Sequence, residues 1–316
     1  MTETTLPTPA VALPAAQVSR RARLAAFALR LRGFAREFAR SPVATMAAVV
    51  LILTILAAVA APLIAPQDPY DLSGLSIMDA RLPPGEQSFT SVTHHLGTDG
   101  LGRDVLSAIL YGLRISLFVG AVSSLIALAI GTVAGLVAAY IGGRLDSAIM
   151  RLVDLQMSFP AILIALILLA ILGRGVDKTM IALVAVQWAY YARTVRASAL
   201  VEREKEYIEA ARSLRLGHVR IIGRHLLPNC TAPLLVVVTV QMASAITLEA
   251  TLSFLGVGLP ETQPSLGLLI ANGYQYLLSG AYWISIYPGV ALLVVIMVIN
   301  LVGDRLRDLL NPGSAR

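Results

Sequence analysis

Residues 115–140 read ISLFVGAVSSLIALAIGTVAGLVAAY, an apolar run without a charged side chain. About 20 such residues cross the roughly 30 Å hydrocarbon core of a bilayer as a helix. Comparable runs lie at residues 43–64, 149–172, 180–200, 231–254 and 286–302. The run at 149–172 reaches spanning length only with Arg151 and Asp154 at its cytoplasmic end and a kink at Pro160. The sequence therefore predicts an all-α integral membrane protein with six transmembrane helices.

The composition of the 316 residues supports the same class. Hydrophobic residues make up 57% and charged residues 14%, and a mean hydropathy of +0.75 lies outside the range of soluble proteins. A basic excess can indicate nucleic-acid binding, but aromatic residues are few and long apolar runs separate the charges, so no nucleic-acid partner is expected. Cys230 is the only cysteine, which excludes an internal disulfide and argues against a cysteine-based metal site.

The positions of Lys and Arg predict the orientation in the membrane. Most of the 25 positive residues fall before residue 43, in the segments after the second and fourth spans, and after residue 304. Positive residues are retained on the cytoplasmic side, so both termini are expected in the cytoplasm. Ala58-Val59-Ala60 resembles a signal-peptide cleavage site, but the tail of about forty residues and a run longer than a signal core of roughly 7–15 residues favour a retained anchor.

The spans divide the chain into a cytoplasmic tail (1–42), an anchoring helix (43–64), an external loop (65–113), a core domain (114–307) and a second cytoplasmic tail (308–316). Proline and glycine predict an ordered loop outside, turning helical near Arg103. His94 and His95 are expected in an exposed turn rather than a metal site. The glycines between 97 and 102 have no lysine beside them, which argues against a phosphate cradle.

The cytoplasmic segment 202–229 has a helical pattern with one interruption. Tyr207, Ala210, Ala211 and Leu214 recur at helical spacing within a predicted helix over 202–214. Gly217 breaks this helix, and a second one is expected over 219–227, closed by Pro228. The shape is that of a helix-turn-helix, but a DNA reader between two membrane spans is not favoured.

Glu209-Ala210-Ala211, followed by HLLP at 225–228, resembles the EAA loop of importer-type ABC permeases, and RIIGRHLLPN at 220–229 is similar to the form found in peptide and nickel permeases. Residues 96–107 (LGTDGLGRDVLS) with 111–117 (YGLRISL) resemble the segment that leads into the core of the C-type dipeptide and oligopeptide permeases. LSFLGVG at 252–258 with PSLG at 264–267 resembles their last external loop. The resemblance covers roughly residues 40 to 312.

This resemblance implies a type I importer fold: a core of five helices preceded by one anchoring helix, in a bacterial plasma (inner) membrane. The implied partners are a homologous second permease, two ABC ATPase subunits docked on the 202–229 loops, and an extracytoplasmic substrate-binding protein. The candidate coupling residues are Tyr207, Glu209, Ala210, Ala211, Leu214, Arg215, Gly217 and Pro228.

The chemistry of this loop suits docking into a groove of another protein. Small residues at 210 and 211 allow close helix contact, and Tyr207 and Leu214 can act as apolar anchors. Glu209 accepts hydrogen bonds from the partner, caps the neighbouring helix, or forms a surface pair with Lys205 or Arg212. The family has glycine six residues after the glutamate, whereas this chain has Arg215. Either the turn moves to Gly217 or Arg215 takes the left-handed conformation, at a cost of about 1 kcal/mol.

Polar residues within the spans are functional candidates because they are expensive in the bilayer. Glu249, between Thr247 and Thr251, is expected to face the pathway or a subunit interface, and a structural or gating role is favoured over substrate binding. Gln187 and Gln241 are further gate or pathway candidates, although they and Asn300 are expected mainly in interhelical hydrogen bonds. Gly131 and Gly135 form a small-xxx-small pair that predicts close helix packing.

The chain is not expected to be an enzyme. Its only lysines, Lys178 and Lys205, follow acidic residues, so the Gly-Lys-Ser/Thr phosphate loop of an ATPase is absent. ATP and magnesium would belong to partner subunits, and no cofactor is expected on this chain. The alternative is a stand-alone ion-coupled transporter, for which Glu249 alone is weak support; an intramembrane enzyme lacks a catalytic pair. Dipeptides, longer peptides, nickel chelates and glutathione-like solutes all remain open as substrates.

Overall fold

The structure is a computed structural model that describes residues 32–71, 76–88, 93–260 and 262–310. The described chain is almost entirely helical. The long helices are α2 (Pro42–Val59), α4 (Val105–Ile141), α5 (Gly143–Met157), α6 (Ala161–Leu172), α7 (Val176–Arg203), α11 (Thr231–Phe254) and α13 (Trp283–Leu310). The short elements are α3 (Ala61–Ile64), η2 (Ile77–Asp79), α8 (Glu206–Ser213), α9 (His218–Ile221), η3 (Ile222–Leu226), α10 (Leu227–Asn229), α12 (Leu266–Tyr274) and η4 (Leu277–Ser279).

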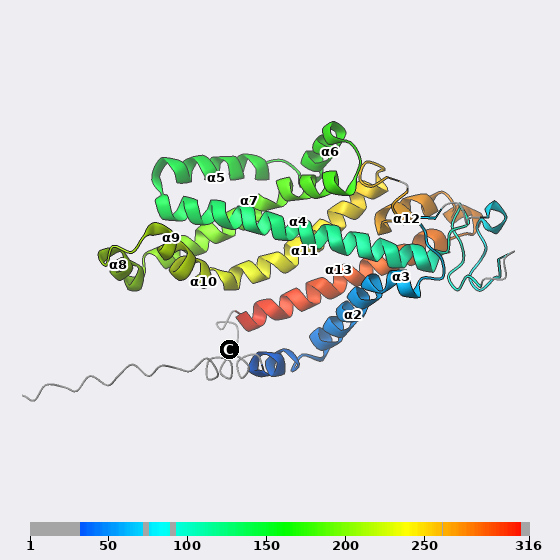
Figure 1. Ribbon diagram of the computed structural model, residues 1–316, viewed down its shortest axis with the longest axis horizontal. Coiled ribbons are helices and arrows are strands. Elements are labelled where there is room, and N and C mark those ends of the chain that lie inside the picture. Colours follow the sequence, from blue (N-terminus) through cyan, green and yellow to red (C-terminus); the bar gives the residue numbers. More distant parts are fainter. Residues whose placement is uncertain (1–31, 72–75, 89–92, 261, 311–316) are drawn as a thin grey trace, which may run out of the picture.

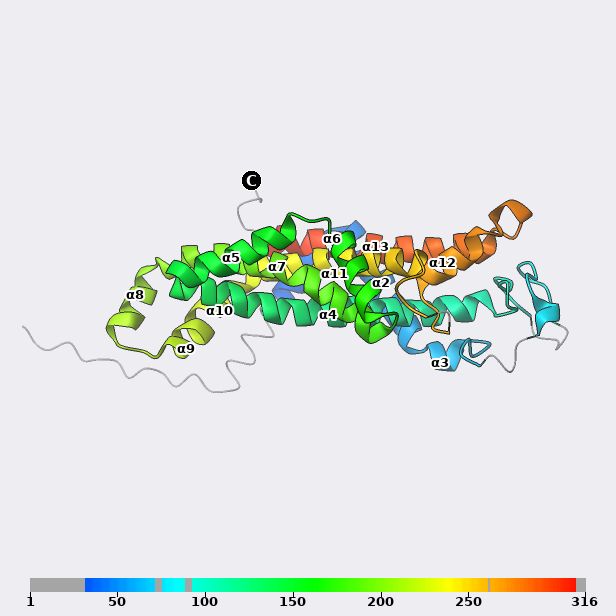
Figure 2. The same ribbon diagram turned by 90° about the horizontal axis from the view of Figure 1, so that it is seen from above.

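Apart from α6, which lies across the others, the long helices run roughly along one axis and form an elongated bundle (Figures 1 and 2). Helices α8, α9 and α10 gather at one end of this bundle, and α12 with the segment before α4 lies at the opposite end. Helix α2 packs against α13 and α4, and α11 lies between α4, α7 and α13. Many large apolar side chains on the outer surface remain exposed, for example Leu53, Ile171 and Leu293, as expected for helices that face lipid.

Four helices of the described chain, α2, α4, α11 and α13, are long and apolar enough to cross a membrane. The pair α5 and α6 would add a fifth crossing if it counts as one span. Helix α7 is 28 residues long, but it carries several charged and polar side chains and fails the same test of composition. The predicted total of six transmembrane helices is therefore not established by length and composition alone.

The third predicted span is not one kinked helix. Helices α5 and α6 meet at a bend of 91° across the residues around Pro160. Pro160 has an extended backbone (φ −58°, ψ 128°) and lies directly before α6. Its ring disfavours helical geometry in the preceding residue, and it has no N–H with which to continue the hydrogen bonds of α5. The helix α5 therefore ends before Pro160. Helix α5 is amphipathic and mostly exposed, whereas α6 is apolar throughout.

The helix expected over 115–140 begins ten residues earlier. Asp104 has an extended backbone, and its carboxylate accepts a hydrogen bond from the Ser107 N–H at 2.7 Å, which caps α4 at Val105. The helical turn expected near Arg103 is thus the start of a 37-residue helix. At 1.5 Å per residue such a helix is about 55 Å long, so it extends beyond the hydrocarbon core.

Helices α4 and α7 pack against each other along most of their length. At Gly131 an added Cβ would lie 2.4 Å from the Trp188 carbonyl oxygen, and at Gly135 it would lie 2.5 Å from the Ala192 carbonyl oxygen. The predicted small-xxx-small contact is confirmed, because the two backbones approach too closely for any side chain at either position. This contact holds the middle of α7 against α4.

Candidate functional site

The loop between α7 and α11 is built from α8, α9, η3 and α10. The helix predicted over 202–214 is wrong at its start, since α7 runs to Arg203 and α8 begins at Glu206. Lys205 between them is extended (φ −77°, ψ 145°), and its Nζ lies 2.7 Å from a carboxylate oxygen of Glu202. The break is therefore stabilised by an ion pair that joins the last turn of α7 to the residue before α8.

Tyr207 ties three helices of this loop together. Its hydroxyl donates to Glu202 on α7 and accepts from Asn229 Nδ2 at 3.0 Å, and Asn229 Nδ2 also lies 2.7 Å from the His225 carbonyl oxygen. Partial burial and the bond to the Glu202 carboxylate raise the pKa of Tyr207 to about 12. The Tyr207 side chain is 38% exposed, so its role as an apolar anchor for a partner stays a prediction, and its hydroxyl is used within the loop.

The loop has a buried face and an exposed face. The buried side chains pack against the ends of α4 and α7, and they are Ile208, Ala211, Ile221 and Leu226. The exposed side chains around the outer face of α8 and the following turn are Glu206, Glu209, Ala210, Arg212, Leu214 and Val219. Of the two alanines expected to contact a partner, only Ala210 is exposed, whereas Ala211 is 4% exposed and belongs to the core. Leu214 is 74% exposed and stays available as an apolar anchor.

Glu209 lies on the exposed face without an ion pair or side-chain hydrogen bond to any described residue. Both of its candidate surface partners are engaged elsewhere. Lys205 pairs with Glu202, and the Arg212 guanidinium lies over the Tyr140 ring at 5.5 Å. The carboxylate of Glu209 is thus free to accept hydrogen bonds from another protein.

Arg215, and not Gly217, takes the left-handed turn. Arg215 has φ +51°, while Gly217 is extended with φ −60° and ψ 143°. The Arg215 N–H donates to the Arg212 carbonyl at 2.8 Å, and the Leu216 N–H donates to the Ala211 carbonyl at 3.2 Å. These two bonds close α8 as a Schellman motif, whose left-handed residue is usually glycine. Arg215 therefore has a strained left-handed backbone at the position where the importer permeases that this loop resembles have glycine.

Pro228 does not close the second helix of the loop. It lies within α10, and the chain continues through Cys230 into α11. Proline cannot donate to the carbonyl four residues earlier and its ring crowds that group. The preceding η3 is a π-helical segment, which widens the backbone before the proline and lets the helical path continue.

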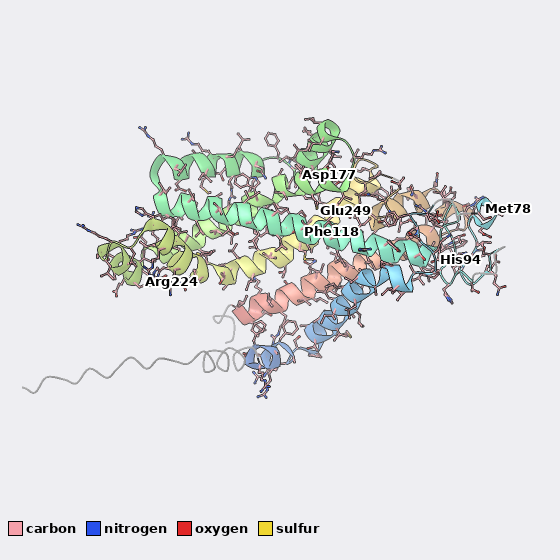
Figure 3. The ribbon with its side chains drawn as sticks, viewed as in Figure 1. Met78, His94, Phe118, Asp177, Arg224 and Glu249 are labelled. Atoms are coloured by element: carbon pink, nitrogen blue, oxygen red, sulfur yellow. The ribbon has the colours of Figure 1, made fainter. Side chains whose placement is uncertain are left out.

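Glu249 is fully buried inside the subunit (Figure 3). Its carboxylate accepts from the Ser116 hydroxyl at 2.8 Å and from the Ser253 hydroxyl at 2.8 Å, and Ser265 before α12 is a third hydroxyl partner. The carboxylate thus joins α4, α11 and the start of α12. The expectation that Glu249 faces a pathway or a subunit interface is wrong for this structure, because the side chain has no exposed surface.

Gln187 makes interhelical hydrogen bonds. Its Nε2 donates to the Gln241 carbonyl of α11 at 2.9 Å, and its Oε1 accepts from the Ser124 hydroxyl of α4 at 3.3 Å. Gln241 is 8% exposed and contributes its backbone rather than its side chain to this bond. Asn300 is different, because its side chain is exposed and has no hydrogen bond to a described residue. Gln187 therefore holds α4, α7 and α11 together.

The external segment carries a second correction. His95 is exposed as expected, but His94 is 5% exposed and its Nδ1 lies 2.9 Å from Asp104 Oδ1 (Figure 3). The amides of Leu101 and Arg103 donate to the Asp99 carboxylate, each at 2.9 Å. The glycine-rich turn thus binds a carboxylate of its own chain, which leaves these amides no room for a phosphate. No group of three or more His, Cys, Asp or Glu within the described ranges could hold a metal ion.

Sequence reasoning missed the residues that hold the site together. Glu202 and Asn229 orient Tyr207 from positions 5 before and 22 after it in the chain. Ser116 bonds to Glu249 from 133 residues away, and no local pattern connects the two. Ser253 lies four residues after Glu249 on the same helix, and that spacing is the signal that could have identified it.

Comparisons with known proteins agree with this geometry. Residues 131–316 match the family described as binding-protein-dependent transport system inner membrane component. Residues 30–84 match the N-terminal transmembrane domain of oligopeptide transport permease C.

Full-length relatives extend the match over most of the chain. A Brucella suis protein named as a peptide transport system permease is 42% identical and covers 84% of this chain and 86% of its own. The dipeptide transport system permease DppC of Escherichia coli K12 is 38% identical, covering 89% and 93%. That of Haemophilus influenzae is 34% identical, covering 89% and 94%.

A solved structure shares the fold. The inward-facing MetNI methionine ABC transporter contains a chain that matches with a TM-score of 0.53 and 22% identity. The match covers 65% of this chain and 96% of that one. The two chains therefore share the arrangement of their helices.

Proposed function

Because the chain belongs to the family of binding-protein-dependent transport system inner membrane components, we propose that it forms half of the pathway through which an ATP-driven importer moves dipeptides or short peptides. It is a permease of the peptide and dipeptide ABC transport group, and it lies in the inner membrane. A homologous permease supplies the other half of the pathway, two ATPase subunits supply ATP and magnesium, and an extracytoplasmic binding protein delivers the peptide. This chain itself holds no cofactor.

The exposed face of α8 supports the docking of an ATPase. Ala210 and Leu214 present a small and an apolar side chain, and Glu209 beside them has an unpaired carboxylate. A short helix with this surface fits a groove in a partner, where the carboxylate accepts charge-assisted hydrogen bonds. This free outer face, on a loop whose inner face is buried, is the observation that carries the proposal.

The buried face explains how the loop transmits movement. Ile208, Ile221 and Leu226 are fully or almost fully buried against α4 and α7, and burying each such side chain contributes about 1.5–3 kcal/mol. The Tyr207 bonds to Glu202 and Asn229 link α8 to the end of α7 and to α10, which leads into α11. A displacement of α8 by the ATPase therefore moves these helices rather than bending the loop, and the resulting rotation opens the pathway to one side at a time.

The orientation follows from the same loop. If the ATPases bind α8 in the cytoplasm, that end of the bundle is cytoplasmic and the end with α12 is external (Figure 1). The Arg305 guanidinium, near the end of α13, donates to the Glu37 carbonyl before α2, so both described ends of the chain lie on one side. Both termini are accordingly placed in the cytoplasm in this proposal.

Ion-coupled transport has less support. A coupling site needs buried charge that can bind and release an ion. The Glu249 carboxylate is surrounded by hydroxyl donors and has no exposed surface, so it is suited to hold helices together. The relatives are transport permease subunits of peptide systems, and none of them is named as an ion-coupled carrier.

The test is co-purification of the permease complex with its ATPases after Glu209→Lys or Ala210→Glu. Both side chains are exposed, so the permease should still fold, while the charge or bulk blocks the groove of the ATPase. Glu86→Lys at the external end is the matched control, because Glu86 is also exposed but lies far from α8. Loss of ATPase from the two loop variants alone supports docking. Retention of ATPase by both would refute it, as would peptide uptake that follows an ion gradient without ATP.

A further inference from the structure

The exposed face of α11 carries three hydroxyl side chains, whereas α2 exposes mainly large apolar side chains. Its outward-facing residues recur at three- and four-residue spacing, and they are Val240, Ser244, Thr247, Thr251 and Phe254. Asn300 of α13 is exposed beside them, and the two helices together with α6 enclose an open groove of about 560 Å³. No charged side chain lines this groove.

The polar groups in the groove have unused hydrogen-bonding capacity. Thr247 and Thr251 donate their hydroxyl protons to backbone carbonyls of α11, at 2.8 and 2.7 Å, which leaves their oxygens as acceptors. The Ser244 hydroxyl and the Asn300 amide make no hydrogen bond to a described residue. Unsatisfied polar groups are costly against hydrocarbon, so this surface does not face lipid.

The groove continues toward the end of the bundle that carries α8. Val240 also lines a second groove of about 690 Å³ between α7, α11 and α13, where Thr194, Gln241 and Arg307 supply the polar groups. The two grooves together extend along α11 and reach the last turns of α13. Because the two grooves share Val240 and carry polar groups at intervals among apolar side chains, they form a path along the helix rather than an isolated pocket.

From these observations we propose that the groove lined by Ser244, Thr247, Thr251 and Asn300 is the wall against which the main chain of a peptide moves; this inference rests on the proposed function. Neutral hydroxyl and amide groups can form hydrogen bonds with the N–H and C=O groups of a peptide backbone, whatever side chains the peptide carries. The wall therefore selects for peptide main chain, and it does so without a charge that would retain the solute.

The first test measures whether the groove holds water. In a Cys230→Ala background, Ser244→Cys and Leu53→Cys are compared in the complete importer in lipid nanodiscs, with a charged, membrane-impermeant thiol reagent. Leu53 is the control because it is 59% exposed on the apolar surface of α2. Thiols react as thiolates, which form in water and not in hydrocarbon, so residue 244 should react more than about tenfold faster than residue 53. Equal, slow reaction at both positions would overturn the proposal.

The second test blocks the groove. Ser244→Trp should reduce ATP-dependent uptake of alanyl-alanine more than tenfold, while Leu53→Trp leaves it near the wild-type rate. If Ser244→Trp separates the two permeases instead, the face is a subunit interface and the proposal fails. If the wild-type importer takes up no peptide but residue 244 still labels, the proposed substrate is wrong and the water-filled groove stands. If uptake is normal and residue 244 does not label, only the groove assignment fails.

Discussion

Gly131 offers the sharpest test of how the bundle is held together. Its added Cβ would lie 2.4 Å from the Trp188 carbonyl oxygen and 2.6 Å from Tyr191 Cβ, whereas ordinary contacts are 3.4 Å or more. Gly131→Ala must therefore separate α4 and α7 by about 1 Å locally, and overpacking of this kind costs about 1–3 kcal/mol. Gly289→Ala in α13 is the matched control, because nothing lies within 4 Å of its added Cβ.

The two variants share the gain in helix propensity from glycine to alanine, about 1 kcal/mol, so their difference isolates the steric cost. Cys230 reports the unfolding, since it is the only cysteine and is fully buried in the native protein. A fluorogenic thiol reagent that reacts with Cys230 during heating should give a lower midpoint for Gly131→Ala than for Gly289→Ala. At about 2–4 °C per kcal/mol the gap is several degrees. Equal midpoints would refute the close contact between α4 and α7.

Three further predictions follow from the loop and the buried carboxylate. Arg215→Gly should stabilise the protein by about 1 kcal/mol and raise its thermal midpoint, because glycine removes the strain of the left-handed turn. Gly217→Ala should change the midpoint little. The reverse order of the two effects would place the turn at Gly217. Glu249→Leu should destabilise the protein by about 1–3 kcal/mol for each serine hydroxyl left without its acceptor, and Glu249→Gln by less; equal thermal midpoints would exclude a structural role. Tyr207 should titrate near pH 12, seen as the difference in ultraviolet absorbance between the wild type and Tyr207→Phe. Since the folded pKa is raised, the stability from this group is complete below pH 10 and lost as the pH rises toward 12; a midpoint at pH 10 would contradict the bond to Glu202.

Hydropathy was sufficient to predict most of the helices. A helix in a bilayer makes all its backbone hydrogen bonds internally, and its lipid-facing side chains must be apolar along its whole length. It was misleading for residues 149–172, where one predicted span joins the end of the amphipathic helix α5 to the apolar helix α6, although a bend at Pro160 separates them. It identified residues 180–200 within α7, but it could not show that Gln187 of this helix is buried between neighbouring helices.

The loop shows a similar division. Helical spacing located α8, but the sequence left the turn at either Arg215 or Gly217, and only the backbone of the structure places it at Arg215. Spacing could not tell Ala210 from Ala211, because the direction in which α8 docks depends on Ile208 and on contacts with α4 and α7. It also could not reveal that Tyr207 turns its hydroxyl inward, since Glu202 and Asn229 meet it only in three dimensions.

The sequence by itself determined that this chain is a membrane-embedded helical permease, because span length, charge asymmetry and local motifs are properties of short stretches of chain. Only the tertiary structure decided which polar groups are buried and which are free. Glu249 became a structural acceptor when Ser116, from a distant helix, came within 2.8 Å, and Ser244 and Asn300 were left exposed because no neighbour reaches them. Such assignments depend on which faces of packed helices meet, and no local pattern carries that information.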